Sequence, residues 1–70
     1  MTSDEMEYMV WVIEKVAAKF FQGDKTLAYN ALKRSGIWEL YTAHYETTHT
    51  LGLEYILEEI GERFEGVGII

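Results

Sequence analysis

The chain has 70 residues, a net charge of −6, ten aromatic residues, and no cysteine or proline. This length makes one domain, residues 1–70, and the lack of cysteine excludes disulfides and zinc–thiolate sites and fits a reducing compartment. The acidic charge argues against DNA or RNA binding, which depends largely on neutralising phosphates. No uncharged run approaches the ~20 residues of a membrane span, and the acidic start is unlike a signal peptide. We therefore expect a cytoplasmic protein without membrane or nucleic-acid partners.

The first predicted helix begins after Thr2. Thr2 and Glu5 form the pattern of a capping box, and apolar residues then recur at the three- and four-residue spacing of an amphipathic helix. Tyr8, Trp11 and Val12 lie off this apolar face and are themselves apolar. Either they are buried under the tail or the third helix, or they form an interface with a partner. The predicted core face consists of Met6, Met9, Val10, Ile13, Val16, Ala17 and Phe20.

Glycines divide the rest of the chain into shorter helical segments. Gly23 and Gly36 suit the left-handed backbone position that ends a helix, and Asp24 is a preferred N-cap residue for the next one. No segment has the sustained alternation of a strand. The sequence therefore predicts an all-α domain, a small three- to four-helix bundle with helices at about 3–22, 24–35, 37–45 and 51–65.

The second half of the chain contains several helix-disfavouring residues. Threonines make residues 46–50 a predicted turn, in which Thr48 or Thr50 caps the last helix. Gly61 falls inside the last helix at a cost of about 1 kcal/mol relative to alanine, which suggests the close approach of another helix. The tail, residues 66–70, either is flexible or docks its two isoleucines on the domain.

Most of the negative charge lies at the end of the chain, where residues 51–70 carry five glutamates against one arginine. Such a run is ordinarily a solvated helix face. The alternative is a recognition surface for a basic partner, for which Glu58 and Glu62 are the candidate residues.

The chain lacks the patterns of common catalytic and phosphate-binding sites, such as Gly-x-Ser-x-Gly or a glycine-rich loop. Glu46 and His49 form one Glu-x-x-His pair, whereas carboxylate-bridged di-iron bundles need two such pairs and two further glutamates. We therefore predict no catalytic residue, no metal site and no cofactor. One alternative is a small-ligand or acid–base site built on His44, His49 and nearby tyrosines. The aromatic residues considered with these histidines are Trp38, Tyr41, Tyr45 and Tyr55.

A motif at the start of the last helix resembles the signature of a small bacterial family catalogued as domain of unknown function 3791. The motif reads His-Thr-Leu-Gly-Leu-Glu-Tyr-Ile-Leu-Glu-Glu-Ile over residues 49–60 and follows a tyrosine. The family has no established activity, and some members are encoded beside ADP-ribosyltransferase-like proteins. The resemblance therefore implies an antitoxin-like or accessory binding role. The matching residues are Tyr45, His49, Thr50, Gly52, Tyr55, Ile56 and Ile60.

The same motif also has a structural interpretation that does not depend on the family. Thr50 at a helix start can accept a backbone N–H, Gly52 allows a backbone or ring to approach closely, and Tyr45 and Tyr55 can flank His49. We therefore predict that His49 holds the third predicted helix against the last one.

Together these features favour a non-enzymatic protein-interaction module. Its partner is another protein or a second copy of the chain in a homodimer. A small domain without disulfides or metals often gains stability by association, and the surplus apolar face of the first helix is suited to this. The two candidate surfaces are the Tyr8 and Trp11 face and the acidic last helix.

Overall fold

The computed structural model describes residues 1–70, which form five helices and no strand. This confirms the predicted all-α fold. The four predicted helices are present, with ends shifted by up to two residues: the first ends at Phe20, the second begins at Lys25, the third ends at Ala43 and the last spans Leu53–Gly66. Part of the predicted turn at 46–50 is a one-turn helix. No helix is both long and apolar enough to span a membrane. The helices are α1 (Ser3–Phe20), α2 (Lys25–Ser35), α3 (Ile37–Ala43), α4 (Tyr45–Thr48) and α5 (Leu53–Gly66).

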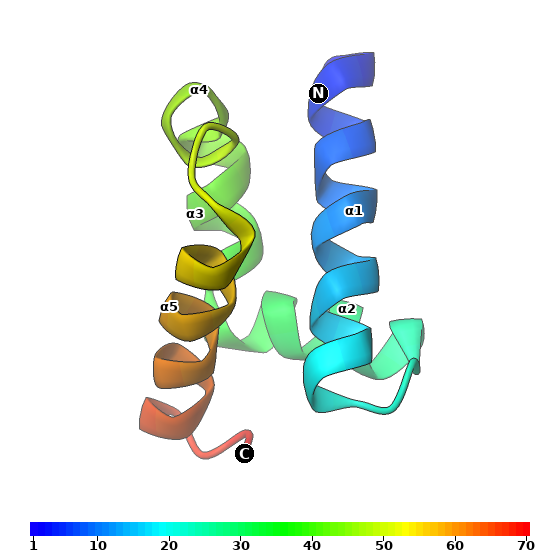
Figure 1. Ribbon diagram of the computed structural model, residues 1–70, viewed down its shortest axis with the longest axis vertical. Helices are drawn as coiled ribbons and strands as arrows, with labels where there is room; N and C mark the ends of the chain where they lie inside the picture. The colour runs from blue at the N-terminus through cyan, green and yellow to red at the C-terminus, as the bar shows by residue number, and fades with distance from the viewer.

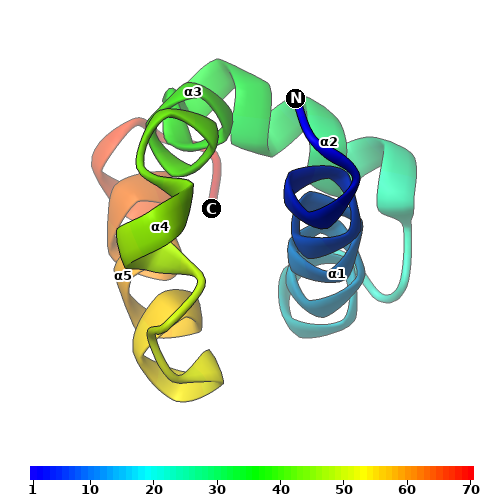
Figure 2. The same ribbon diagram turned by 90° about the horizontal axis from the view of Figure 1, so that it is seen from above.

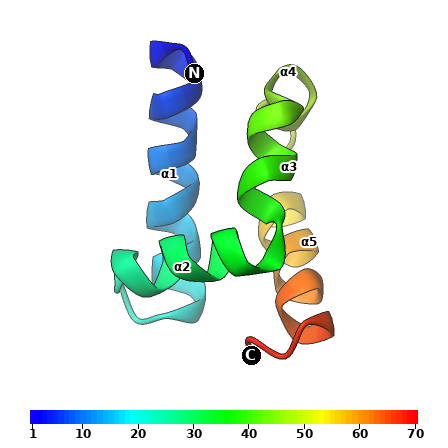
Figure 3. The same cartoon turned by 180° about the vertical axis from the view of Figure 1, so that it is seen from behind.

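The helices form two sides joined by α2 (Figure 1). On one side stands α1; on the other, α5 runs in the same direction as α1 while α3 runs in the opposite direction beside it. Figure 3 shows α2 crossing from the end of α1 to the start of α3. From above, α4 lies with α3 and α5, across from α1 (Figure 2).

One core of twelve buried residues connects these helices. Val12 is part of this core at 1% exposure, while Met6 and Val10, predicted to face inward, are 50% and 46% exposed. The predicted core face of α1 is therefore partly wrong, because α1 turns Val12 rather than Met6 and Val10 toward the other helices. The core residues are Met9, Val12, Val16, Ala17, Ala28, Ala31, Leu32, Ile37, Tyr41, Ile56, Ile60 and Phe64.

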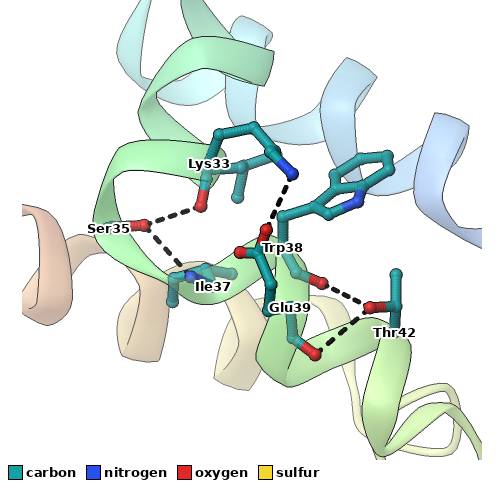
Figure 4. Close-up of polar contacts among 7 residues, drawn as sticks. Lys33, Ser35, Ile37, Trp38, Glu39 and Thr42 are labelled. Atoms are coloured by element: carbon teal, nitrogen blue, oxygen red, sulfur yellow. Dashed lines mark hydrogen bonds and ion pairs between the residues drawn. The ribbon is translucent and has the colours of Figure 1, made fainter.

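A tight corner sets the direction of α3 relative to α2. Gly36 has φ of +82°, the left-handed conformation expected of a helix-ending glycine. The buried Ser35 hydroxyl donates to the Leu32 carbonyl (3.1 Å) and accepts from the Ile37 N–H (3.3 Å), as Figure 4 shows. These bonds satisfy backbone groups that the end of α2 and the start of α3 would otherwise leave unpaired.

Two hydrogen bonds to the carbonyl of His44 stabilise the single turn of α4; the donors are the N–H groups of Thr47 (3.0 Å) and Thr48 (2.9 Å). These bonds keep the threonines, which disfavour helix interiors, in a helical conformation for one turn. The Thr47 carbonyl then accepts both the hydroxyl (2.7 Å) and the backbone N–H (3.4 Å) of Thr50. Neither Thr48 nor Thr50 caps the last helix as predicted, because its N-cap is Gly52, without a side-chain bond.

The tail is docked by the turn that ends α5. Gly68 has φ of +76°, its N–H donates to the Glu65 carbonyl (3.1 Å), and the Ile69 N–H donates to the Phe64 carbonyl (2.8 Å). This pair of bonds is a Schellman motif. Ile69 packs against the core, whereas Ile70 remains 53% exposed.

Candidate binding surfaces

The family motif centres on a stacked pair of rings in α4 and at its end. The rings of Tyr45 and His49 lie 4.4 Å apart and nearly parallel, and His49 Nδ1 lies 2.6 Å from the Tyr45 carbonyl oxygen. Tyr8 of α1 meets both rings edge-on, at centroid distances of 5.5 Å and 6.4 Å. The aromatic contacts of His49 therefore link α4 to α1, rather than the third predicted helix to the last.

Tyr8 also ties α1 to α4 through its hydroxyl, which donates to the Thr48 carbonyl (3.1 Å). Burial raises the pKa of the Tyr8 hydroxyl above its ordinary value. Trp11 is half-buried and stacks on Tyr8 at 5.9 Å. Because Tyr8 and Trp11 are partly covered and Val12 is in the core, these three residues do not form a continuous exposed patch, as the interface alternative would require.

Gly52 and Tyr55 of the motif lie apart from the ring cluster, which consists of Tyr8, Trp11, Tyr45 and His49. A Cβ added at Gly52 would meet no atom within 4 Å, so the predicted close approach at this glycine is wrong. Tyr55 is 56% exposed and lies beside Glu58, Glu59 and Glu62. Of the two tyrosines expected to flank His49, only Tyr45 makes an aromatic contact with it.

The two histidines do not converge on one pocket. His44 lines a polar hollow of about 380 Å³ with Glu5 and Glu46, and His49 is not among its lining residues. No group of three or more histidine and carboxylate side chains is placed to hold a metal ion. The geometry therefore gives the alternative ligand or acid–base site no shared cavity.

A hydrogen bond that the sequence did not reveal joins α3 to α5. The fully buried Tyr41 donates its hydroxyl to Glu59 Oε1 (2.8 Å). Burial and the bond to Glu59 raise the pKa of the Tyr41 hydroxyl well above its usual range. The usable signal was that Glu59 directly precedes Ile60, a core residue, which places Glu59 at the edge of the buried face rather than with the exposed glutamates.

A groove between α1 and α5 has a volume of about 550 Å³. Its floor is formed by Phe20 of α1, Leu57 and Gly61 of α5, and Ile70 of the tail, and we call it the α1/α5 groove. Glu58 of the predicted interface lines this groove, while Glu62 lies in the adjoining acidic hollow with Tyr55. The charged residues on its rim are Lys19, Glu54, Glu58 and Glu65.

Gly61 allows α1 and α5 to approach closely at the α1/α5 groove. A Cβ at this position would lie 3.1 Å from Cζ of Phe20, closer than most carbon contacts. The absence of a side chain thus lets the Phe20 ring lie against α5, which confirms the predicted close approach at Gly61. Phe20 in turn packs edge-on against Phe64 of the core, at 5.6 Å.

The charges around the groove have no ionic partner within the chain. The only two ion pairs are Lys25–Glu14 (3.9 Å) and Lys33–Glu39 (2.7 Å, Figure 4), and neither involves a groove residue. The hydrogen bond of the second pair raises the pKa of Lys33 and lowers that of Glu39. The groove charges are therefore free to interact with a bound molecule.

Comparison with known proteins places the chain in a family without assigning an activity. Residues 7–65 match the family model described as "Protein of unknown function (DUF3791)". No curated protein and no solved structure matches the chain. The matched region includes most of α1, all of α2, α3 and α4, and all of α5 but its last residue, and it holds every residue of the ring cluster. The chain is therefore a member of the DUF3791 family.

Proposed function

We propose that this protein is a non-enzymatic protein-interaction module whose α1/α5 groove binds a basic, apolar segment of a partner protein. The observation that supports this is a partly exposed apolar floor beside three carboxylates that have no ionic partner in the chain. Apolar burial favours binding, and complementary charge selects the partner and speeds association. An antitoxin-like or accessory role would use the groove in this way.

The partner proposed is a different protein rather than a second copy of the chain. Glu54, Glu58 and Glu65 lie on the same face of α5 and line the same groove. In a two-fold dimer through this groove, that face would meet itself. The carboxylates would then repel one another, and like charges across an interface are strongly unfavourable.

The test uses a fluorescent amphipathic peptide of leucine and lysine, about 15 residues long to allow about four helical turns. Its affinity is measured by anisotropy for the wild type, for Glu54→Lys/Glu58→Lys in the groove, and for Glu7→Lys/Glu46→Lys as a control. The control residues are exposed, lie outside the groove and form no ion pair. Both double variants change the net charge equally.

We expect the groove variant to weaken peptide binding at least tenfold and the control variant to weaken it about threefold or less. Both variants reduce the long-range attraction between the acidic protein and the basic peptide, but only the groove variant also removes charges that pair directly with the bound peptide. Leu57→Ser should also weaken binding without any change in charge. Equal losses in both double variants would refute the groove as the binding surface. Self-association in sedimentation equilibrium that the groove variant abolishes would also overturn the proposal, by making a second copy the occupant.

A further inference from the structure

Building on the proposed function, we infer that the groove takes an amphipathic α-helix of about three turns with differently charged flanks. Its basic flank lies along α5 and its other flank places an acidic residue against Lys19. The groove has one acidic rim and one basic rim, so its charge pattern selects a partner helix with oppositely charged flanks. It also fixes the direction of that helix, because reversing the helix would place each flank against the rim of like charge.

A helix is the backbone form that this surface accommodates. Peptides that bind as added strands need a free sheet edge, and this chain has no strand. Proline-rich segments bind in aromatic-lined grooves, whereas this floor has a single aromatic ring, Phe20. A helix that lays its apolar face into a groove requires only side-chain contacts, and these are what the floor offers.

The length of the acidic rim sets the length of the bound helix. Glu54, Glu58 and Glu65 are separated by one turn and then by about two turns of α5, so they follow one line along the helix. From first to last they span about 16 Å at 1.5 Å per residue. A partner helix lying alongside needs about eleven residues, with basic residues near the two ends of that span.

Lys19 makes the two rims of the groove unequal. It is exposed, and it is the only basic residue lining the groove, on the α1 side. All three glutamates belong to α5. A helix with lysines on both flanks therefore places one flank against an ammonium group, whereas a helix with lysines on one flank and glutamates on the other can satisfy both rims at once.

The test compares two leucine-based helical peptides of equal length. One carries lysines on both flanks, and the other carries lysines on one flank and glutamates on the other. Each is titrated by anisotropy against the wild type, Lys19→Glu and Lys25→Glu. Lys25 is a matched control because its side chain is 67% exposed and lies outside the groove.

We expect Lys19→Glu to shift the ratio of the two dissociation constants about fivefold toward the all-lysine peptide, the upper range for one exposed charge pair. In Lys25→Glu the ratio should remain within about twofold of wild type. The same ratio in all three proteins would overturn the inference and leave the proposed function standing. Equally tight binding of a same-composition peptide with strand-type alternation would refute the helical mode. Failure of both peptides to bind wild type would reject the proposed function itself.

Discussion

Replacing Tyr41 by phenylalanine removes one buried hydroxyl and leaves the ring in place. In the wild type this hydroxyl donates to Glu59 at 2.8 Å, and hydrogen bonds to charged groups contribute about 1.5–3 kcal/mol. Glu59 is only partly buried, so water can reach the carboxylate left behind. We therefore expect Tyr41→Phe to lower the free energy of unfolding at pH 7 by about 2 kcal/mol.

The same hydrogen bond gives the wild type a specific alkaline instability. Because burial and Glu59 raise the pKa of the Tyr41 hydroxyl in the folded chain, its contribution to stability is complete below pH 10, where the unfolded chain begins to ionise. Above that pH the contribution falls by up to about 1.4 kcal/mol per pH unit. A 2 kcal/mol advantage would then disappear near pH 11.5, at about 1.5 units above the ordinary tyrosine pKa.

Urea denaturation of both proteins at several pH values from 7 to about 11.5 tests this prediction. The stability difference should be constant up to pH 10 and then shrink. Tyr55→Phe is the control, because Tyr55 is on the same helix as Glu59, is 56% exposed and makes no hydrogen bond through its hydroxyl. Wild-type and Tyr41→Phe curves that stay parallel through pH 11.5, or a control that behaves like Tyr41→Phe, would refute the reasoning.

Three further predictions concern the helix junctions. Tyr8→Phe should lose about 0.5–1.5 kcal/mol of stability in urea melts, since it removes the hydroxyl bond to α4; an unchanged midpoint would contradict this. His49→Ala should lower stability by about 0.5–1.5 kcal/mol through loss of its ring stack. His44→Ala removes an equally exposed ring that makes no aromatic contact and should change stability little in thermal melts. Ser35→Ala should lose about 1–3 kcal/mol, because its buried hydroxyl serves two backbone groups; Ser3→Ala, exposed at the start of α1, is the control and should differ clearly from it in urea.

Local signals in the sequence were sufficient to predict the four longer helices with ends within two residues of those in the structure. The capping box of Thr2 and Glu5 is present in the structure, and Gly36 ends its helix in the expected left-handed conformation. These features depend on residues a few positions apart, so the sequence contains them directly. The close approach at Gly61 was also predicted, because a glycine inside a helix is unfavourable unless packing requires it.

The orientation of α1 about its axis depends on contacts with other helices, which cannot be inferred from the local sequence pattern. This helix is apolar on most sides, so periodicity alone allowed Met6 and Val10 to be inside and Val12 to be outside. The structure has the opposite arrangement, because α2 covers one end of α1 and the Tyr8 side faces α4. For the same reason the sequence identified Glu58 as an interface residue but did not place it in one groove with Phe20.

The use of α2 as a bridge at one end has a consequence for local opening. Residues 3–8 of α1 contain no core residue and meet the α4 region through one hydroxyl bond and a few aromatic contacts, whereas the α2 junctions contribute buried residues to the shared core. Regions held by few buried contacts open before the whole domain unfolds. Amide hydrogens of α4 and the first turns of α1 should therefore exchange with solvent faster than those of α2. Local opening then separates α1 from α4, whereas the α1/α5 groove, which lies toward the end joined by α2, keeps its shape.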